Sequence, residues 1–291
     1  DRFEGLILVD VNCLTDGKPD NNFTERVVTF NPNGALDGAE HLVVAGAVVY
    51  VCCKQGLVAV SVDDPRAPKI LSTVPLEAPT SVAVQFRYAF VTTRKGLEIV
   101  DITLPEAMQA TGASVPLADA RNVYVARTYA YVAAGKDGMA IVNVTVPTSP
   151  VLQEQFAAGG KLADVNQIKV GMVNDSAYAL VADGKTGLHV LQLVTPEDDR
   201  KASAYGFAPK PMPKWIASRA TDGPALAIAK GLERDRAVDE SGHQISVFGR
   251  IGGRPFTLAE MRKMLLMKDG KPTPVSDTPP AGWQPQPFDT K

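Results

Sequence analysis

A seven-residue phrase that begins with glycine recurs five times in the first two thirds of the chain. The copies are Gly5–Val11, Gly56–Val62, Gly96–Ile102, Gly138–Val144 and Gly187–Leu193. Their glycines are 51, 40, 42 and 49 residues apart, which is a typical period for stacked structural repeats. The phrase therefore predicts a repeat architecture but no particular activity, because repeat folds carry many unrelated functions.

Each repeat contains four short segments with the composition of β-strands. In the third repeat they are residues 121–126, 129–133, 138–145 and 151–157, rich in Val, Ile and Tyr and bounded by turn residues. Four such strands per repeat predict an all-β fold, a β-propeller of four-stranded antiparallel blades. The expected blade units are residues 36–76, 77–117, 118–162 and 163–207, plus a half-blade at about 1–35.

The half-blade needs partners from the C-terminal part of the chain. Gly5–Val11, with residues 27–30 behind it, supplies only the outer strands of a blade, and residues 225–230 and 244–248 are candidates for the missing inner strands. The prediction is a five-bladed propeller domain over residues 1–250, closed by N- and C-terminal strands. Residues 251–291 are expected to add a helix between Thr257 and Gly270 and a Pro-rich extended tail.

The third strand of each unit is a continuous apolar run, which is typical of strands buried on both faces. This predicts that the following residues lie between blades: Ile99, Val100, Ile141, Val142, Val190 and Leu191. Cys52 and Cys53 are adjacent on a strand and would point to opposite faces. One of them is then a small core residue, and the alternative is a redox pair.

Three phrases support a resemblance to a known family. Gly96-Leu-Glu-Ile-Val-Asp101, Asp64-Pro-Arg-Ala-Pro68 and the strand Tyr129-Ala-Tyr-Val132 are similar to the LVIVD-repeat family. The resemblance covers about residues 1–195 and implies propeller blades in bacterial or archaeal proteins that are exported or at the cell surface. It implies no common activity. The chain departs from the repeat consensus where aspartate is typical, at Ser61, Asn143 and Gln192.

Composition and motifs disfavour several classes of function. Thirty basic and 32 acidic residues give a net charge of −2, unlike most nucleic-acid-binding proteins, and no apolar run is long enough to span a bilayer. The three histidines, His41, His189 and His243, are far apart in sequence, and no Cys-x-x-Cys-His, Gly-x-Ser-x-Gly or nucleotide-binding motif occurs. We therefore expect no catalytic residues and no resident cofactor, with calcium as the one candidate ion.

The calcium candidate is the loop that contains Asp16, Asp20 and Asn22. Its side chains offer the oxygen ligands that Ca²⁺ prefers, and the loop is long enough to wrap around a cation. The alternative is a plain solvated turn, because Asp and Asn are common in turns and Lys18 lies in the middle of the loop.

Charged residues recur in loops that should emerge on the same face of a propeller. The hairpins between the second and third strands carry Lys54, Arg94, Lys95, Lys136 and Lys185. The connections between blades carry Asp37, Glu40, Glu77, Asp119 and Asp164. Two readings stay open: these charges form a docking surface, or they pair with one another as exposed salt bridges.

The favoured function is a non-catalytic binding or scaffolding module of an exported or surface-associated protein, located outside the cytoplasm. Its partner would be another protein or further segments of a longer chain. The alternative is the haem-free propeller part of a redox assembly, with a cytochrome partner that carries the active group on another segment or subunit.

Overall fold

The computed structural model describes residues 1–11, 23–173, 176–195 and 210–229, together with five later pairs, 250–251, 254–255, 267–268, 271–272 and 281–282. The chain divides into two compact units. The first comprises Asp1–Leu6 and Phe30–Ala229, and the second comprises Ile7–Thr29 and Lys230–Lys291. Within the described ranges, no helix has the length and apolar character needed to cross a membrane.

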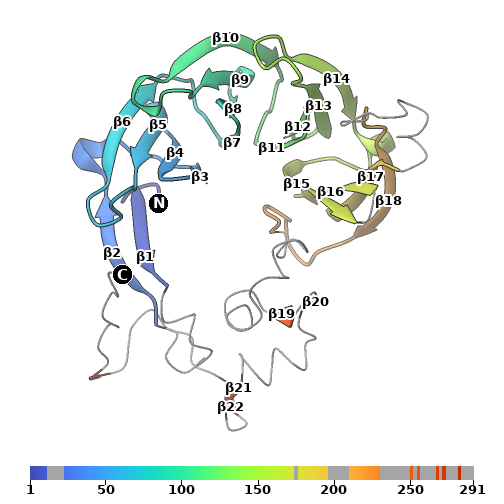
Figure 1. The fold of residues 1–291 in the computed structure, drawn as a ribbon. Coiled ribbons are helices and arrows are strands. Elements are labelled where there is room, and N and C mark those ends of the chain that lie inside the picture. Colours follow the sequence, from blue (N-terminus) through green and yellow to red (C-terminus); the bar gives the residue numbers. More distant parts are fainter. Residues whose placement is uncertain are drawn as a thin grey trace. The chain divides into compact units, whose positions relative to one another are not determined.

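Four antiparallel sheets of four strands follow one another in the first unit (Figure 1). The first two contain β3 (His41–Ala45), β4 (Val48–Cys53), β5 (Gly56–Ser61) and β6 (Lys69–Val74), then β7 (Ser81–Gln85), β8 (Tyr88–Thr93), β9 (Gly96–Asp101) and β10 (Gln109–Pro116). The last two contain β11 (Asn122–Ala126), β12 (Tyr129–Ala133), β13 (Met139–Asn143) and β14 (Val151–Phe156), then β15 (Val165–Val173), β16 (Ser176–Asp183), β17 (Gly187–Val194) and β18 (Lys214–Arg219). The predicted all-β fold with propeller-like, four-stranded antiparallel blades is confirmed.

The remaining strands form two-stranded sheets. β1 (Leu6–Asp10) pairs with β2 (Glu25–Phe30), β19 (Arg250–Ile251) with β20 (Arg254–Pro255), and β21 (Met267–Lys268) with β22 (Lys271–Pro272). Three short 3-10 turns complete the set: η3 (Pro32–Gly34), η4 (Pro105–Ala107) and η5 (Ala158–Gly160).

Some C-terminal expectations differ from the structure or fall outside it. Residues 225–229 belong to no strand, and residues 244–248 lie outside the described part of the chain. Hydrogen bonds do not join the described sheets into a closed ring, so closure by these segments stays a prediction. Most of the helix expected from Thr257 is also outside the described residues, and Met267, expected to be helical, lies in β21.

Three hydrophobic clusters hold neighbouring sheets together, and the third strands supply side chains to both of their faces. Val100 packs between the first and second sheets, and Ile99 and Val142 between the second and third. Ile141 and Leu191 pack between the third and fourth. These five are buried as predicted. Successive residues point to opposite faces of a strand, so each apolar run serves two interfaces.

Val190 departs from this prediction because it is only half-buried. It lies on the face of β17 opposite Leu191, and therefore points away from the third sheet. No further four-stranded sheet follows the fourth among the described residues, so that face lacks the cover that a fifth sheet would provide.

The glycine that opens each third strand is required by a close backbone approach. Gly56 and Gly96 have φ values of 122° and 126°, and a Cβ atom on either would collide with the carbonyl oxygen at the end of the outer strand, that of Val74 or Val115. Gly138 and Gly187 meet the carbonyls of Phe156 and Arg219 in the same way. Only glycine combines a positive φ with this approach, which explains why it recurs in the repeated phrase.

Polar side chains at the start of the inner strands connect each sheet to the next. His41 Nδ1 accepts a hydrogen bond from the backbone N–H of Val82 at 3.3 Å. The same contact joins Ser81 Oγ to Val123 N (3.4 Å) and Asn122 Oδ1 to Ile168 N (3.2 Å). We call these contacts the acceptor series. They satisfy inner-strand N–H groups that point toward the neighbouring sheet and would otherwise lack a partner.

Candidate functional site

Two sets of loops meet at one end of the four sheets, which we call the loop face. It consists of the hairpins between the second and third strands of each sheet and the segments that lead into each first strand. Lys54 N donates to Asp37 O at 3.0 Å, and Arg94 N donates to Glu77 O at 3.1 Å. In the fourth sheet, Gly184 N donates to Asp164 O at 2.8 Å. The sequence-predicted basic and acidic loops are therefore neighbours in each of these sheets.

Arginines pair with the acidic residues of this face. Arg2 Nη2 lies 2.6 Å from Glu40 Oε2, and Arg94 Nε lies 3.8 Å from Glu77 Oε1. The side chains of both pairs are largely exposed, so each contributes under about 1 kcal/mol to stability. Of these two arginines, sequence analysis had singled out only Arg94.

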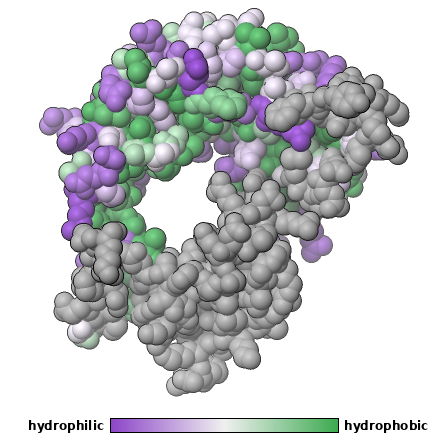
Figure 2. Space-filling model, viewed as in Figure 1, coloured by the Kyte–Doolittle hydropathy of each residue, from purple (hydrophilic) through white to green (hydrophobic). Residues whose placement is uncertain are grey.

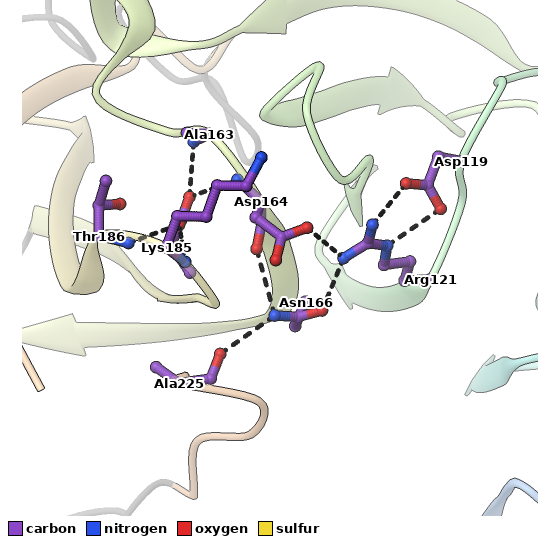
Figure 3. Close-up of polar contacts among 9 residues, drawn as sticks. Asp119, Arg121, Ala163, Asp164, Asn166, Lys185, Thr186 and Ala225 are labelled. Carbon is purple, nitrogen blue, oxygen red and sulfur yellow. Dashed lines mark hydrogen bonds and ion pairs between the residues drawn. The ribbon is translucent and has the colours of Figure 1, made fainter. Parts of the chain in front are cut away.

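Arg121 connects the third sheet to the fourth (Figure 3). Its guanidinium donates to both carboxylate oxygens of Asp119, at 3.0 and 2.7 Å, and to Asp164 Oδ1 and Asn166 Oδ1, each at 2.7 Å. Hydrogen bonding to Asp119 and Asp164 raises the pKa of Arg121, against the opposing effect of burial. Two acids of the predicted docking surface therefore share one counter-charge, from a residue that sequence analysis did not select.

Two glycines make room for these carboxylates. A Cβ atom on Gly135 would collide with Asp119 Oδ2, and one on Gly184 would collide with Asp164 Oδ2. Gly135 and Gly184 stand immediately before Lys136 and Lys185. The Gly-Lys pair in these two hairpins, together with the Asp119-x-Arg121 spacing, is a sequence signal that could have identified the cluster.

Asp183 holds the hairpin of the fourth sheet in shape. Its Oδ2 accepts from Ala163 N (2.7 Å) and Asp164 N (2.9 Å), and its Oδ1 accepts from Lys185 N and Thr186 N (both 2.9 Å). Although burial acts to raise the pKa of Asp183, these four backbone N–H groups hold it below its usual value. The backbone that carries Lys185 is thereby fixed.

The four hairpin lysines differ from the arginines. Lys54, Lys95, Lys136 and Lys185 are all exposed. None forms an ion pair with another residue in the described part of the chain. The stem of Lys54 lies over Gly38, where a Cβ atom would stand 2.7 Å from the lysine Cγ. The loop face therefore carries acids paired with arginines beside lysines whose ammonium groups are solvated.

A buried histidine in the fourth sheet has the partners of a structural residue. His189 is 2% exposed, and its Nδ1 accepts from Trp215 Nε1 at 3.2 Å. Because Nδ1 is an acceptor, the neutral ring carries its proton on Nε2, which lies 2.7 Å from Thr186 Oγ1. Nε2 then donates to the threonine and cannot act as a base toward it. The Lys161 ammonium lies over the Trp215 ring, 3.4 Å from its centre.

The other candidate residues do not assemble into a site that the structure describes. Asp16, Asp20 and Asn22 lie outside the described residues, and within the described part no group of three potential metal ligands occurs. Cys52 and Cys53 are free and buried, and Cys52 packs between the first and second sheets, as the structural interpretation predicted. Burial raises the pKa of both thiols, which disfavours the reactive thiolate form.

Several solved structures are similar to this chain at low sequence identity. The chain is 11% identical to a functionally unknown protein from Desulfotomaculum acetoxidans, with a TM-score of 0.57 and coverage of 81% of this chain and 72% of that one. An extracellular domain of BT4673 from B. thetaiotaomicron matches with 12% identity, a TM-score of 0.42 and coverage of 58% and 22%. Apo AztD from Citrobacter koseri matches with 15% identity, a TM-score of 0.39 and coverage of 65% and 49%.

At these identities the likeness concerns the fold alone. The chain also spans less than two thirds of several of these structures, including 47% of the computationally designed Ika8 protein. No curated protein matches the sequence significantly.

A family model agrees with the resemblance found in the sequence. The LVIVD repeat model matches residues 79–112 and 118–158. The first range contains β7, β8, β9 and the first half of β10 in the second sheet, and the second range contains β11–β14 of the third sheet. The family model thus matches two neighbouring sheets of the chain, in agreement with the resemblance found in the sequence.

Proposed function

We propose that the chain is a non-catalytic binding module whose loop face docks an acidic region of a protein partner. The observation that carries this proposal is that arginines and lysines of the loop face differ in their ion pairing. Arginines pair with Glu40, Glu77, Asp119 and Asp164, whereas the four hairpin lysines form no ion pair with a described residue. A repeated, exposed and solvated ammonium group at matching positions of four sheets suits recognition of carboxylates.

The rigidity of the face supports the same proposal. The hairpins of three sheets are hydrogen-bonded through the backbone to the segments that lead into the first strands, and Asp183 organises the hairpin of Lys185. Loops fixed in this way lose little conformational entropy when a partner binds. Figure 2 shows hydrophilic and hydrophobic residues interspersed over the described surface in that view.

A location outside the cytoplasm is part of the proposal. It is supported by the LVIVD repeats, whose resemblance implies exported or surface proteins. Fractionation of cells that express the native full-length gene tests this location directly. Recovery of the protein in the cytoplasmic fraction alone would contradict it.

The docking role can be tested with poly-L-glutamate as a defined acidic polypeptide. We expect the chain to bind this probe with an affinity that falls as salt rises, because the contacts are between exposed charges. Replacing Lys54, Lys95, Lys136 and Lys185 together with Gln should weaken binding between about fourfold and several hundredfold, since four exposed contacts of about 0.2–1 kcal/mol each sum to about 0.8–4 kcal/mol.

The matched control replaces four basic residues at the opposite end of the sheets with Gln. Suitable positions are Arg66, Lys69, Arg87 and Lys214, all of which are exposed. The control removes the same net charge and should change the affinity less than twofold. Equal losses in the two variants would show that the probe senses net charge only, and would reject the loop face as the docking surface.

A further inference from the structure

The acceptor series does not stop at the fourth sheet. Gln167 stands at the start of the inner strand β15, in the position that His41, Ser81 and Asn122 occupy in the first three sheets. Its Oε1 accepts a hydrogen bond from Ile228 N at 2.6 Å. Ile228 therefore stands in the place that Val82, Val123 and Ile168 take relative to the sheet before them.

A second hydrogen bond repeats the same relation. Thr80, which precedes the acceptor Ser81, donates from Oγ1 to the carbonyl of Ala120 at 3.1 Å. Asn166, which precedes the acceptor Gln167, donates from Nδ2 to the carbonyl of Ala225 at 3.2 Å. Ala120 lies three residues before Val123, and Ala225 lies three residues before Ile228. Two separate contacts thus place residues 225–228 in the same register.

The connection that precedes this segment also matches. The third-strand glycines of the first three sheets approach the outer-strand carbonyls of Val74, Val115 and Phe156, and the loop acids Glu77, Asp119 and Asp164 follow three, four and eight residues later. Arg219 is the corresponding end of β18, and Asp222 follows it by three residues. Figure 1 shows the chain returning after β18 to the inner side of the fourth sheet, beside β15.

From these three observations we infer that residues 220–229 are the start of a fifth repeat unit. Residues 225–229 take the place of its inner strand, although they belong to no ladder among the described residues. Residues 220–224 take the place of the connection between sheets, so Asp222 becomes the counterpart of Glu77, Asp119 and Asp164. The loop face thereby extends by one sector beyond the four sheets.

The sequence had indicated residues 225–230 only as a candidate inner strand, without its register or the connection that precedes it. No glycine-led phrase marks residues 220–229, because that phrase belongs to third strands. The series also ends here, since Ala227, at the position of the acceptor side chains, has no side-chain acceptor of its own.

Residue-resolved amide hydrogen exchange of the full chain tests the inference. In the wild type, we expect the Ile228 amide to be protected, and we expect the same of the Val82, Val123 and Ile168 amides. Gln167→Ala should abolish protection at Ile228, while Gln167→Glu should retain it because a carboxylate still accepts the bond. Gln155→Ala, at an exposed position of β14, is the matched control and should leave Ile228 unchanged.

Two results would overturn the inference. One is exchange of the wild-type Ile228 amide at the rate of an unstructured chain. The other is equal protection of Ile228 in the wild type and in Gln167→Ala, because the acceptor would then not be the group that holds the segment. If Gln167→Ala exposes amides throughout the fourth sheet, the variant Asn166→Ala replaces it, with loss of protection near Ala225 and Ile228 as the expected result and unchanged protection there as the contrary one.

Discussion

The inner strand of the first sheet and those of the next three sheets have similar sequences but very different burial. Leu42 on β3 is 45% exposed, whereas Val82, Val123 and Ile168, at the matching position of the later sheets, are 2%, 3% and 0% exposed. Each of the buried residues belongs to an inner strand that follows another four-stranded sheet in the chain, and Leu42 does not. Burial in this fold is therefore set by the neighbouring repeat rather than by the strand itself.

Truncation of a core residue should separate the two environments most clearly. Ile141 is fully buried between the third and fourth sheets, and Ile141→Ala should cost about 2–5 kcal/mol of unfolding free energy through lost packing and a cavity. Val44 on β3 is 58% exposed, so Val44→Ala should change stability by less than about 0.5 kcal/mol. Urea unfolding measures both, and similar shifts would contradict the comparison.

Removal of an arginine should also cost more stability where the residue connects two sheets than where it is exposed, with smaller values than for core truncation. Arg121→Met leaves Asp119 and Asp164 close together without a counter-charge, and should cost about 1–2 kcal/mol, since the cluster is about one third exposed. Arg94→Met breaks a longer, more exposed pair and should cost less than about 0.5 kcal/mol. Equal costs would mean that Arg121 does not couple the two sheets.

Acid should weaken the fourth sheet through His189. Burial lowers the pKa of His189, and Lys161 acts in the same direction against the opposing effect of Asp183. The folded protein then binds fewer protons than the unfolded chain, so this contribution to stability is complete above the unfolded pKa of 6.5 and is lost as the pH falls below it. Protonated Nδ1 can no longer accept from Trp215.

This pH dependence can be followed by Trp215 fluorescence during unfolding in the Trp283→Phe background, which removes the other tryptophan. His189→Gln should flatten the loss of stability between neutral and mildly acidic pH. His41, whose pKa is also lowered by burial, supplies the control variant for the first sheet. A pH profile that is identical with and without His189 would assign the effect to other groups.

Charge reversal on the loop face should have the smallest effect on stability. Lys95→Glu together with Lys136→Glu should shift the unfolding free energy by less than about 0.5 kcal/mol, because both side chains are exposed and form no ion pair with described residues. Differential scanning calorimetry measures this shift. A large destabilisation would mean that these lysines support the fold instead of leaving their charge for a partner.

The sequence predicted the parts of the fold that follow from periodicity. The glycine-led phrases located the third strand of each four-stranded sheet. The apolar runs correctly placed residues such as Ile141 and Val142 between sheets. The outer strand of the fourth sheet was not predicted. The expected blade unit ended at residue 207, whereas β18 begins at Lys214. Its sequence, with Trp215 and Ile216 in a Pro-rich context, resembles none of the other outer strands.

The candidate site was predicted less completely, for a physical reason. The recurring charges in hairpins and connections predicted that these residues share one face, and backbone hydrogen bonds make the two sets of loops neighbours in three sheets. The recurring charges could not indicate which of these residues pair, because an ion pair depends on side chains that come from different sheets, as Arg121 and Asp164 do. The distinction between paired arginines and solvated lysines emerged only from three-dimensional contacts.

The acceptor series has a consequence for how the chain forms during translation. In each contact the earlier repeat supplies the side chain and the later repeat supplies the backbone N–H, as with His41 and Val82. A ribosome releases the earlier repeat first. A repeat that has left the ribosome therefore already carries the side-chain acceptor to which the backbone of the next repeat will bind. The chain is thus built for ordered addition at its growing end.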